Sequence, residues 1–313
     1  MITEDQLEQL CLDWFKETGY EYAYGLDIAP DGDTPERRDY RGVVLEGRLL
    51  QQLQRINPHI PLATLEQVVA QVAKPDSPVL INANKTFHQY LLEGVKVEYR
   101  DNGEEKHDYA RLIDFASVQN NQFLVVNQFS IIGTKGHRRP DVVVFINGLP
   151  LAVIELKNPA DNHADILKAY DQLQTYKDEI PDLFAFNEAL VISDGWDARI
   201  GTLTASRERF MIWRTVKDES DKPAWDYQLE TLVKGFFNPE LLLDYLRFFQ
   251  LFEQSGDVTV KKMAGYHQFH AVRAAVQATL IAANKRAAAA AEDRADYHKR
   301  AEPGSGKAGV VWH

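Results

Sequence analysis

Two apolar runs joined by Asn147-Gly148 constrain the fold of this chain more than any other feature of its sequence. The segment from Arg138 to Pro159 reads RRPDVVVFINGLPLAVIELKNP. Asn-Gly is a strong hairpin signal because both residues accept the positive φ that tight two-residue turns require. Nearly unbroken apolar runs are typical of strands that are buried on both faces. The sequence therefore predicts a buried β-hairpin.

Three charged residues lie near the open end of this hairpin. Desolvating a charged side chain costs several kcal/mol, so charges in buried strands are normally paired or bound to a metal. A two-residue loop places Asp141 opposite Ile154, and a four-residue loop places it opposite Leu156. Either register brings Asp141 beside Glu155. Lys157 projects to the same face as Glu155, because side chains two residues apart in a strand share a face.

Two converging carboxylates suit a hard divalent cation such as Mg²⁺, which takes one or two carboxylates and keeps several waters. A metal held by Asp141 and Glu155 would lower the pKa of a bound water, and Lys157 would stabilise developing negative charge. This chemistry fits phosphodiester hydrolysis. The alternative is an ordinary ion pair at a strand end, because the spacing of Glu155 and Lys157 also arises by chance.

The flanking periodicity predicts an α/β fold with a mixed sheet covered by helices. Thr3 and Gln6 form a capping-box pattern at the start of the first helix, and Gly19 ends it. The core order is helix, three strands, helix, strand. Helices are expected at 3–19, 45–56, 65–72, 161–177 and 241–252, and strands, besides the hairpin, at 95–100, 110–115, 122–132, 189–194, 199–205 and 209–216.

These residues resemble the PD-(D/E)xK nuclease superfamily, whose core has the order αβββαβ and is a restriction-endonuclease-like mixed sheet. Across the whole chain, the hairpin block, Thr3-Glu4 with Glu8, and the DQLQTY segment look like the restriction subunit of type I restriction-modification enzymes. The resemblance implies that Asp141 and Glu155 bind metal and that Lys157 is catalytic. It also implies that Gln172 and Tyr176, four apart on one helix face, support cleavage.

Two further groups are candidates for the same site. Similar nucleases carry a supporting acid in the first helix, which makes Glu8 a tentative metal ligand, with Glu46 on the next helix as its competitor. Arg138 and Arg139 belong to a basic cluster immediately before Asp141. They are candidates for contacts to the DNA backbone, which position DNA without reading its sequence. An ordinary solvated turn is equally compatible with the cluster.

Two C-terminal segments were compared with the nucleotide-binding segments of motor domains. Gly304 to Lys307 resembles a phosphate-binding loop but fails the pattern, because Ala301 stands in place of the first glycine and Ala308 in place of Ser or Thr. GYHQFHAVRAAV resembles the adenine-contacting segment of superfamily 2 motors, with Gln268 as the contact, although an amphipathic helix explains it as well. We expect an endonuclease domain at 1–220, linker helices forming a C-terminal connector at 221–256, and the start of a truncated motor domain at 257–313. ATP would then bind only in the full-length subunit.

Composition limits the setting in which the protein works. The formal net charge of the 313 residues is −11, so contact with double-stranded DNA must come from local basic clusters or partners. The resemblance implies that those partners are the methyltransferase and specificity subunits of the restriction complex, and that cleavage follows ATP-driven translocation. The single cysteine, Cys11, fits a small core residue better than a reactive thiol. No signal peptide or membrane span is recognisable, which favours the cytoplasm.

Two other functions remain compatible with the sequence. One is a stand-alone nuclease of the same fold that acts in repair or junction resolution. The other is a non-catalytic assembly module whose charged strand end is structural.

Overall fold

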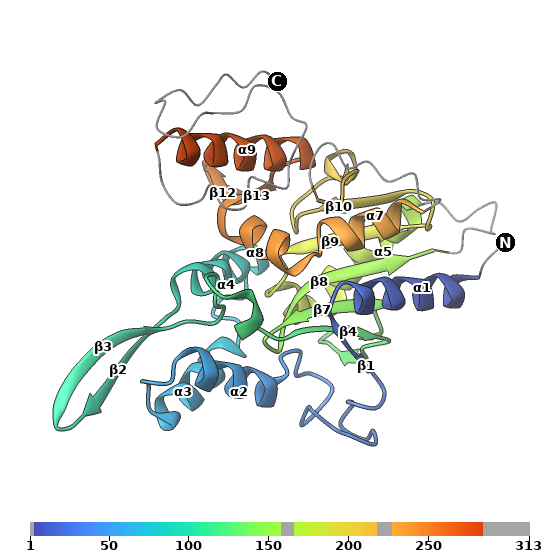
Figure 1. Cartoon of the computed structure of the whole chain (residues 1–313). Coiled ribbons are helices and arrows are strands. Elements are labelled where there is room, and N and C mark those ends of the chain that lie inside the picture. Colours follow the sequence, from blue (N-terminus) through green and yellow to red (C-terminus); the bar gives the residue numbers. More distant parts are fainter. Residues whose placement is uncertain (1–2, 158–165, 218–226, 284–313) are drawn as a thin grey trace.

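A seven-stranded mixed sheet forms the centre of the protein. The computed structural model describes residues 3–157, 166–217 and 227–283. Helices α1 and α7 lie on one face of the sheet and α5 lies on the other (Figure 1). The predicted mixed α/β architecture is confirmed. In spatial order the strands are β1 (Glu21–Tyr24), β4 (Phe123–Asn127), β7 (Val142–Ile146), β8 (Leu149–Leu156), β9 (Ala189–Ser193), β10 (Ala198–Gly201) and β11 (Met211–Ile212).

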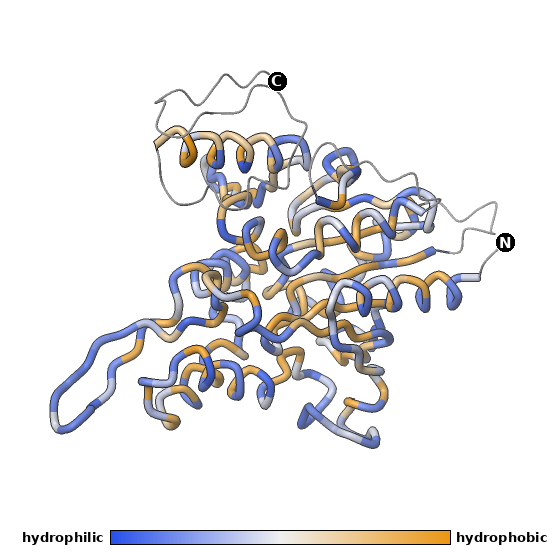
Figure 2. The backbone as a smooth tube through the Cα atoms, viewed as in Figure 1, coloured by the Kyte–Doolittle hydropathy of each residue, from blue (hydrophilic) through white to orange (hydrophobic). Residues whose placement is uncertain are grey.

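The predicted hairpin is β7 and β8, and every residue of both strands is buried. Asn147 and Gly148 form the turn with φ of 53° and 81°. A Cβ at Gly148 would lie 2.6 Å from the backbone oxygen of Leu45, so this position needs glycine for its conformation and for close contact. Figure 2 shows the hydrophobic residues concentrated along these central strands. The hairpin prediction is therefore confirmed.

The two-residue-loop register predicted for the hairpin holds only next to the turn, where Phe145 pairs with Pro150 and Ile146 with Leu149, and the four-residue-loop register does not form. The pairing shifts between Val144 and Phe145, where Leu151 is the extra residue on β8. A β-bulge of this kind changes the face on which the following side chains lie. Continuing the pairing of Val142 with Ile154 by one residue places Asp141 opposite Glu155, whereas the sequence predicted Ile154 or Leu156 as its partner.

Helix α1 (Glu4–Glu17) begins as predicted. The Gln6 amide N–H donates to Thr3 Oγ1 at 3.3 Å, and the Thr3 N–H donates to Gln6 Oε1 at 2.9 Å. Its apolar side faces the sheet and includes Cys11, a buried free cysteine. Burial raises the pKa of the Cys11 thiol, which agrees with a core role.

Three helices, α2 (Glu46–Ile56), α3 (Leu62–Val72) and α4 (Leu80–Glu93), follow β1 along the chain. The first two were predicted, but α4 was not. Its buried residues Ala83, Phe87 and Leu91 follow helical spacing, although Asn82, Asn84 and Thr86 lower its helix propensity. The buried face outweighs that propensity.

Strand β2 (Val95–Asp101) was predicted but is not part of the central sheet. It pairs with β3 (Glu104–Ala110) in a ribbon that projects away from the body of the protein (Figure 1). Residues 111–115, predicted as a strand, have no strand structure. The unpredicted β1 instead occupies the sheet edge, parallel to β4. Short strands β5 (Ile131–Ile132) and β6 (His137–Arg138) form a second ribbon, and 3-10 turns lie at Val118–Asn120 and Arg207–Arg209.

The second half of the core follows the predicted order. Helix α5 (Ile166–Glu179) and the short α6 (Pro181–Phe184) connect β8 to β9, which run parallel. The predicted helix begins at 161, but its first residues lie outside the described part of the chain. Of the strands expected at 199–205 and 209–216, only Ala198–Gly201 and Met211–Ile212 form. The core α1, β4, β7, β8, α5 and β9 has the αβββαβ order of a nuclease-like fold.

The C-terminal elements are α7 (Gln228–Gly235), α8 (Pro239–Phe248), β12 (Gln250–Ser255), β13 (Val258–Met263) and α9 (Tyr266–Ala282). Helix α7 packs on α1, where Lys234 Nζ lies 2.7 Å from Glu17 Oε2. The helix expected at 241–252 ends at Phe248, because the alternating QLFEQS sequence pairs with β13 instead. The predicted connector therefore also contains a strand, and its domain boundaries stay predictions. Within the described residues, no helix combines the length and apolar character needed to cross a membrane.

Candidate active site

The bulged hairpin brings Asp141, Glu155 and Lys157 together at one end of the sheet. Lys157 Nζ lies 2.7 Å from Glu155 Oε1 and also donates to the Leu156 carbonyl at 2.9 Å. The Leu156 N–H donates to Asp141 Oδ2 at 2.7 Å, which fixes the first carboxylate against the strand that carries the second. All three predicted residues therefore belong to one cluster.

The two carboxyls have strongly perturbed pKa values. Burial raises the pKa of Asp141 to about 6, although the Leu156 N–H and the charge of Lys157 oppose that rise. Burial and the neighbouring Asp141 carboxylate raise the pKa of Glu155 well above its ordinary value. One lysine does not neutralise two buried carboxylates, so the site favours a proton or an added cation.

One carboxylate oxygen of the site receives no hydrogen bond from the residues that the structure describes. Glu155 is fully buried, and its Oε2 has no hydrogen-bond partner among the described residues. An unpartnered buried carboxylate oxygen is costly unless a ligand satisfies it. The same part of the chain contains no group of three or more His, Cys, Asp or Glu side chains that could hold a metal ion. The donors present are thus two carboxylates, a set that Mg²⁺ completes with water and phosphate.

Glu8 lies near the cluster on α1 but is held by other residues. Its Oε1 accepts from Asn127 Nδ2 at 2.7 Å, and its Oε2 accepts from Gln128 Nε2 at 2.5 Å. Its charge still acts on Asp141 and raises the pKa of that carboxyl. The exposed Glu46 begins α2, where the preceding Leu45 N–H bonds to the carbonyl of Gly148 at the opposite end of the hairpin. Of the two competing acids, only Glu8 faces the site.

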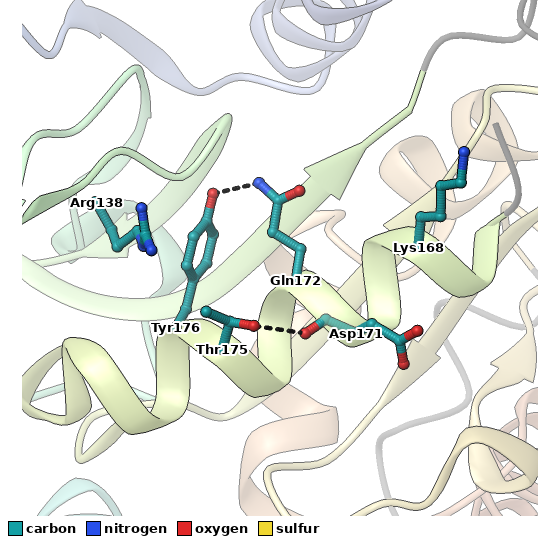
Figure 3. A pocket seen from close by; sticks show the side chains of 6 residues that line it. All are labelled: Arg138, Lys168, Asp171, Gln172, Thr175 and Tyr176. Carbon is teal, nitrogen blue, oxygen red and sulfur yellow. Dashed lines mark hydrogen bonds between the residues drawn. The ribbon is translucent and has the colours of Figure 1, made fainter. Parts of the chain in front are cut away.

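Gln172 and Tyr176 face the cluster from α5. Gln172 Nε2 donates to the Tyr176 hydroxyl at 2.5 Å, and Figure 3 shows the two side chains pointing toward each other. Burial raises the pKa of the Tyr176 phenol, and the Glu155 carboxylate raises it further. The predicted helix pair therefore lies within electrostatic range of the Asp141 and Glu155 carboxylates.

An open hollow of about 540 Å³ lies beside this pair (Figure 3). It offers two cationic side chains and several hydrogen-bonding groups. The lining residues are Arg138, Lys168, Asp171, Gln172, Thr175 and Tyr176.

The basic cluster is partly neutralised by α5. Arg138 makes a two-pronged ion pair with Glu179, and Lys135 pairs with Asp178. Arg139 is exposed. Of this cluster, which the sequence placed next to the site, Arg138 lines the hollow, and its guanidinium is paired with the Glu179 carboxylate.

Gln268 lies far along the chain at the start of α9. Its Oε1 accepts a hydrogen bond from the Gly265 N–H at 2.9 Å, so its amide caps that helix. The predicted nucleotide contact is not tested by this geometry. Gly304 to Lys307, rejected as a phosphate-binding loop, lies outside the described residues.

Comparison with known proteins identifies the family. Residues 1–209 match the family model described as the N terminus of the type I restriction enzyme R protein. The chain belongs to this family. It is 42% identical over its full length to the type I restriction enzyme HindI endonuclease subunit of Haemophilus influenzae. It is 32% identical, over 89% of its length, to the protein named as the MjaIXP endonuclease subunit of Methanocaldococcus jannaschii.

These R-protein relatives are much longer than the chain. The alignment covers 28% of the HindI subunit and 28% of the MjaIXP subunit. Another relative, the EcoprrI endonuclease subunit of Escherichia coli, is 28% identical over 60% of the chain, and this alignment covers 58% of that relative. The chain thus corresponds to the N-terminal part of such subunits.

The structure adds site residues that the sequence did not single out. Glu4 on α1 acts electrostatically on both Asp141 and Glu155. Asn127 and Gln128 hold Glu8, and Gln128 does so from a backbone with φ of 54°. The sequence offered one weak signal for them, because a polar Asn-Gln pair interrupts the apolar run of β4.

Proposed function

We propose that this chain is the metal-dependent DNA endonuclease module of a type I restriction enzyme and hydrolyses phosphodiester bonds. The observation that carries the proposal is the pair of buried carboxyls with raised pKa values, one with an unpartnered oxygen, beside Lys157. Perturbed carboxyls in such an arrangement are typical of functional sites. The names of the relatives support the restriction role.

The residues present fit Mg²⁺. Asp141 and Glu155 would hold it, and Glu155 Oε2, which has no hydrogen bond among the described residues, is available as a donor. Bound there, Mg²⁺ supplies a water of lowered pKa and neutralises charge on phosphate oxygens. Glu8 supports the site as an outer acid that adds negative charge and fixes the end of β4 through Asn127 and Gln128. The tentative role of Glu8 is therefore indirect.

The other residues position the phosphate. Lys157, only partly buried, lies where its ammonium can stabilise negative charge as the bond breaks. Gln172 orients the Tyr176 hydroxyl toward the same region. Arg138 and Arg139 contact the DNA backbone at the rim of the hollow, and the bidentate geometry that Arg138 uses for Glu179 also suits a phosphate.

In the longer subunit, the remaining domains act as the motor. We propose that ATP binds only there, with Gln268 as an adenine contact, and that ATP-driven translocation precedes cleavage. The methyltransferase and specificity subunits then deliver double-stranded DNA, which suits a chain with a net charge of −11. These assignments rest on the family, because the chain spans only 28% of its first relatives.

Plasmid nicking tests the nuclease role. Supercoiled plasmid is incubated with the chain and Mg²⁺, and relaxed DNA is measured against Asp141→Asn and Lys157→Met. Removing a single stabilising group from the transition state typically lowers a rate by about 100- to 1,000-fold, and we expect that loss for Lys157→Met.

Lys168→Met is the matched control, because it removes a lysine from the hollow but leaves the cluster intact. Equal nicking by all four proteins would refute the site. If none of them nicks, the same comparison is made in the assembled restriction complex, where a retained Lys157→Met rate would refute it.

A further inference from the structure

The turn between β9 and β10 lies next to the candidate active site. Strands β8 and β9 run parallel, so their carboxyl ends meet at the same end of the sheet. The Lys157 N–H donates to the Ser193 carbonyl at 2.9 Å, and the turn Asp194 to Asp197 follows Ser193 directly. The turn therefore lies at the end of the sheet that carries Lys157.

Hydrogen bonds hold the turn in one conformation. Ser193 Oγ accepts from the Gly195 N–H at 2.8 Å and donates to the Asp197 carbonyl at 2.9 Å. The Asp197 N–H donates to Asp194 Oδ1 at 2.8 Å. Gly195 has φ of 90°, and a Cβ there would lie 3.0 Å from Leu7 on α1. The turn is thus preorganised and packed against the helix that carries Glu8.

The turn exposes a large aromatic ring. Trp196 is 55% exposed, whereas tryptophan is highly buried on average. The ring leans on Tyr227, with centroids 5.1 Å apart, and Tyr227 leans on the buried Trp14 at 6.0 Å. This aromatic row fixes Trp196 from the protein side and leaves its outer side open to solvent.

The surroundings of Trp196 select the kind of ligand. The same turn carries two carboxylates, Asp194 and Asp197, so it does not attract a phosphate. Arg199 compensates one of them at 3.0 Å from Asp197. A neutral flat ligand is favoured instead, and next to a phosphodiester site that ligand is a nucleobase. Bases in an intact duplex are stacked on one another, so only an unpaired base offers its face.

We propose that Trp196 stacks on an unpaired nucleobase next to the phosphate held at Asp141, Glu155 and Lys157. The proposal rests on the proposed function and deepens it, because it makes DNA with a displaced base the preferred substrate of this site. Tyr227 is the positioning residue that holds the ring.

DNA binding without cleavage tests the proposal. A fluorescein-labelled 30-base-pair duplex carries either no bulge or a two-nucleotide bulge, and anisotropy is measured in EDTA with the whole chain. We expect the chain to bind the bulged duplex about tenfold more tightly, as one stacked base allows. Trp196→Leu abolishes this preference, and Trp196→Phe retains it because a ring remains.

A third DNA keeps the test decisive even if Trp196→Leu folds poorly. Replacing the two bulged nucleotides with abasic residues preserves the phosphates but removes the base faces, so the wild-type preference disappears. A wild-type chain with equal affinity for paired and bulged DNA would overturn the proposal, as would an abasic bulge bound as tightly as the normal one. Either result is expected if Trp196 instead contacts a partner protein.

Failure of this proposal is distinguishable from failure of the nuclease role. Asp141→Asn, which removes the metal site, retains the preference for bulged DNA if Trp196 stacks. A chain that prefers the bulge but never nicks keeps the stacking site and loses the nuclease function. A chain whose nicking depends on Asp141 but which binds paired and bulged DNA equally keeps the nuclease function and loses the stacking site.

Discussion

Two lysine-glutamate pairs of nearly equal length in the described part of the chain have a buried carboxylate, and only one of the two fits a metal site. Lys157 Nζ lies 2.7 Å from Glu155, and Lys261 Nζ lies 2.6 Å from Glu188. Both glutamates leave one carboxylate oxygen without a hydrogen bond among the described residues. Distance and burial alone therefore do not separate catalytic pairs from structural ones.

The charged groups next to each pair distinguish the two pairs. Next to Glu155 stands a second carboxylate, Asp141, and the pKa of Glu155 is raised by burial and by that charge. Next to Glu188 stands His88, with Nδ1 at 3.0 Å. Burial alone would raise the pKa of Glu188, but Lys261 and His88 lower it. The first pair carries excess negative charge that a cation can balance, and the second is balanced within the protein.

The largest expected difference between the two pairs is in how much the loss of each glutamate charge changes the free energy of unfolding. Glu188→Gln leaves Lys261, which is 0% exposed, without an anionic partner, and breaking such a pair costs about 3–5 kcal/mol. Glu155→Gln instead relieves repulsion with Asp141, so we expect unchanged or higher stability. Urea unfolding in metal-free buffer measures both variants. A large loss for Glu155→Gln would show that this pair is structural too.

A slightly smaller contrast concerns pH. The pKa of Asp141 is raised from 3.8 to about 6, so the folded state binds this proton more tightly than the unfolded chain. The stability that this proton confers is present below about pH 4 and is lost as the pH rises to about 6. By linkage it amounts to at most about 3 kcal/mol.

Urea unfolding of wild type and Asp141→Asn between pH 4 and pH 7 measures this effect. We expect the difference in the free energy of unfolding between the two proteins to change between about pH 4 and pH 6. At pH 7 the variant should be the more stable protein. Glu188 has the opposite sign, because its pKa is lowered and its stabilising effect is lost as the pH falls. Identical pH profiles for wild type and Asp141→Asn would contradict the environment described for Asp141.

The smallest expected effect separates the two supporting acids. Glu8→Gln disturbs the contacts with Asn127 and Gln128 and removes a charge near Asp141, so we expect plasmid nicking to fall about tenfold. Glu46→Gln is the matched control at the far end of the hairpin and should leave nicking unchanged. Equal rates for these two variants would remove Glu8 from the site.

The hairpin and its three charged residues were predictable because periodicity and the Asn-Gly turn are local signals. The register was not, because the bulge at Leu151 depends on packing across the sheet. Without that bulge, a two-residue loop places Asp141 on the face opposite to Glu155. The sequence thus indicated the right residues, although the two-residue-loop register holds only beside the turn and not at Asp141.

Other misses have the same physical origin. Helix α4 contains residues of low helix propensity, and its buried side becomes decisive only against the folded core. Strand β2 has the expected period, but whether a strand joins the central sheet or forms a separate ribbon depends on tertiary contacts. The ion pair between Arg138 and Glu179 joins elements 41 residues apart, and no local pattern indicates it. These three features therefore depend on contacts between residues far apart in the sequence, which local patterns do not indicate.

Calorimetric titration of the chain with Mn²⁺, in place of Mg²⁺, tests the central claim most directly. We predict that wild type and Glu188→Gln bind the ion at one site, that binding releases protons near pH 6, and that Asp141→Asn and Glu155→Gln lose it. The proton release follows from the raised pKa of Asp141. Wild-type affinity in Asp141→Asn, or no binding by the wild-type chain at millimolar metal, would contradict the assignment of this pair as the metal site.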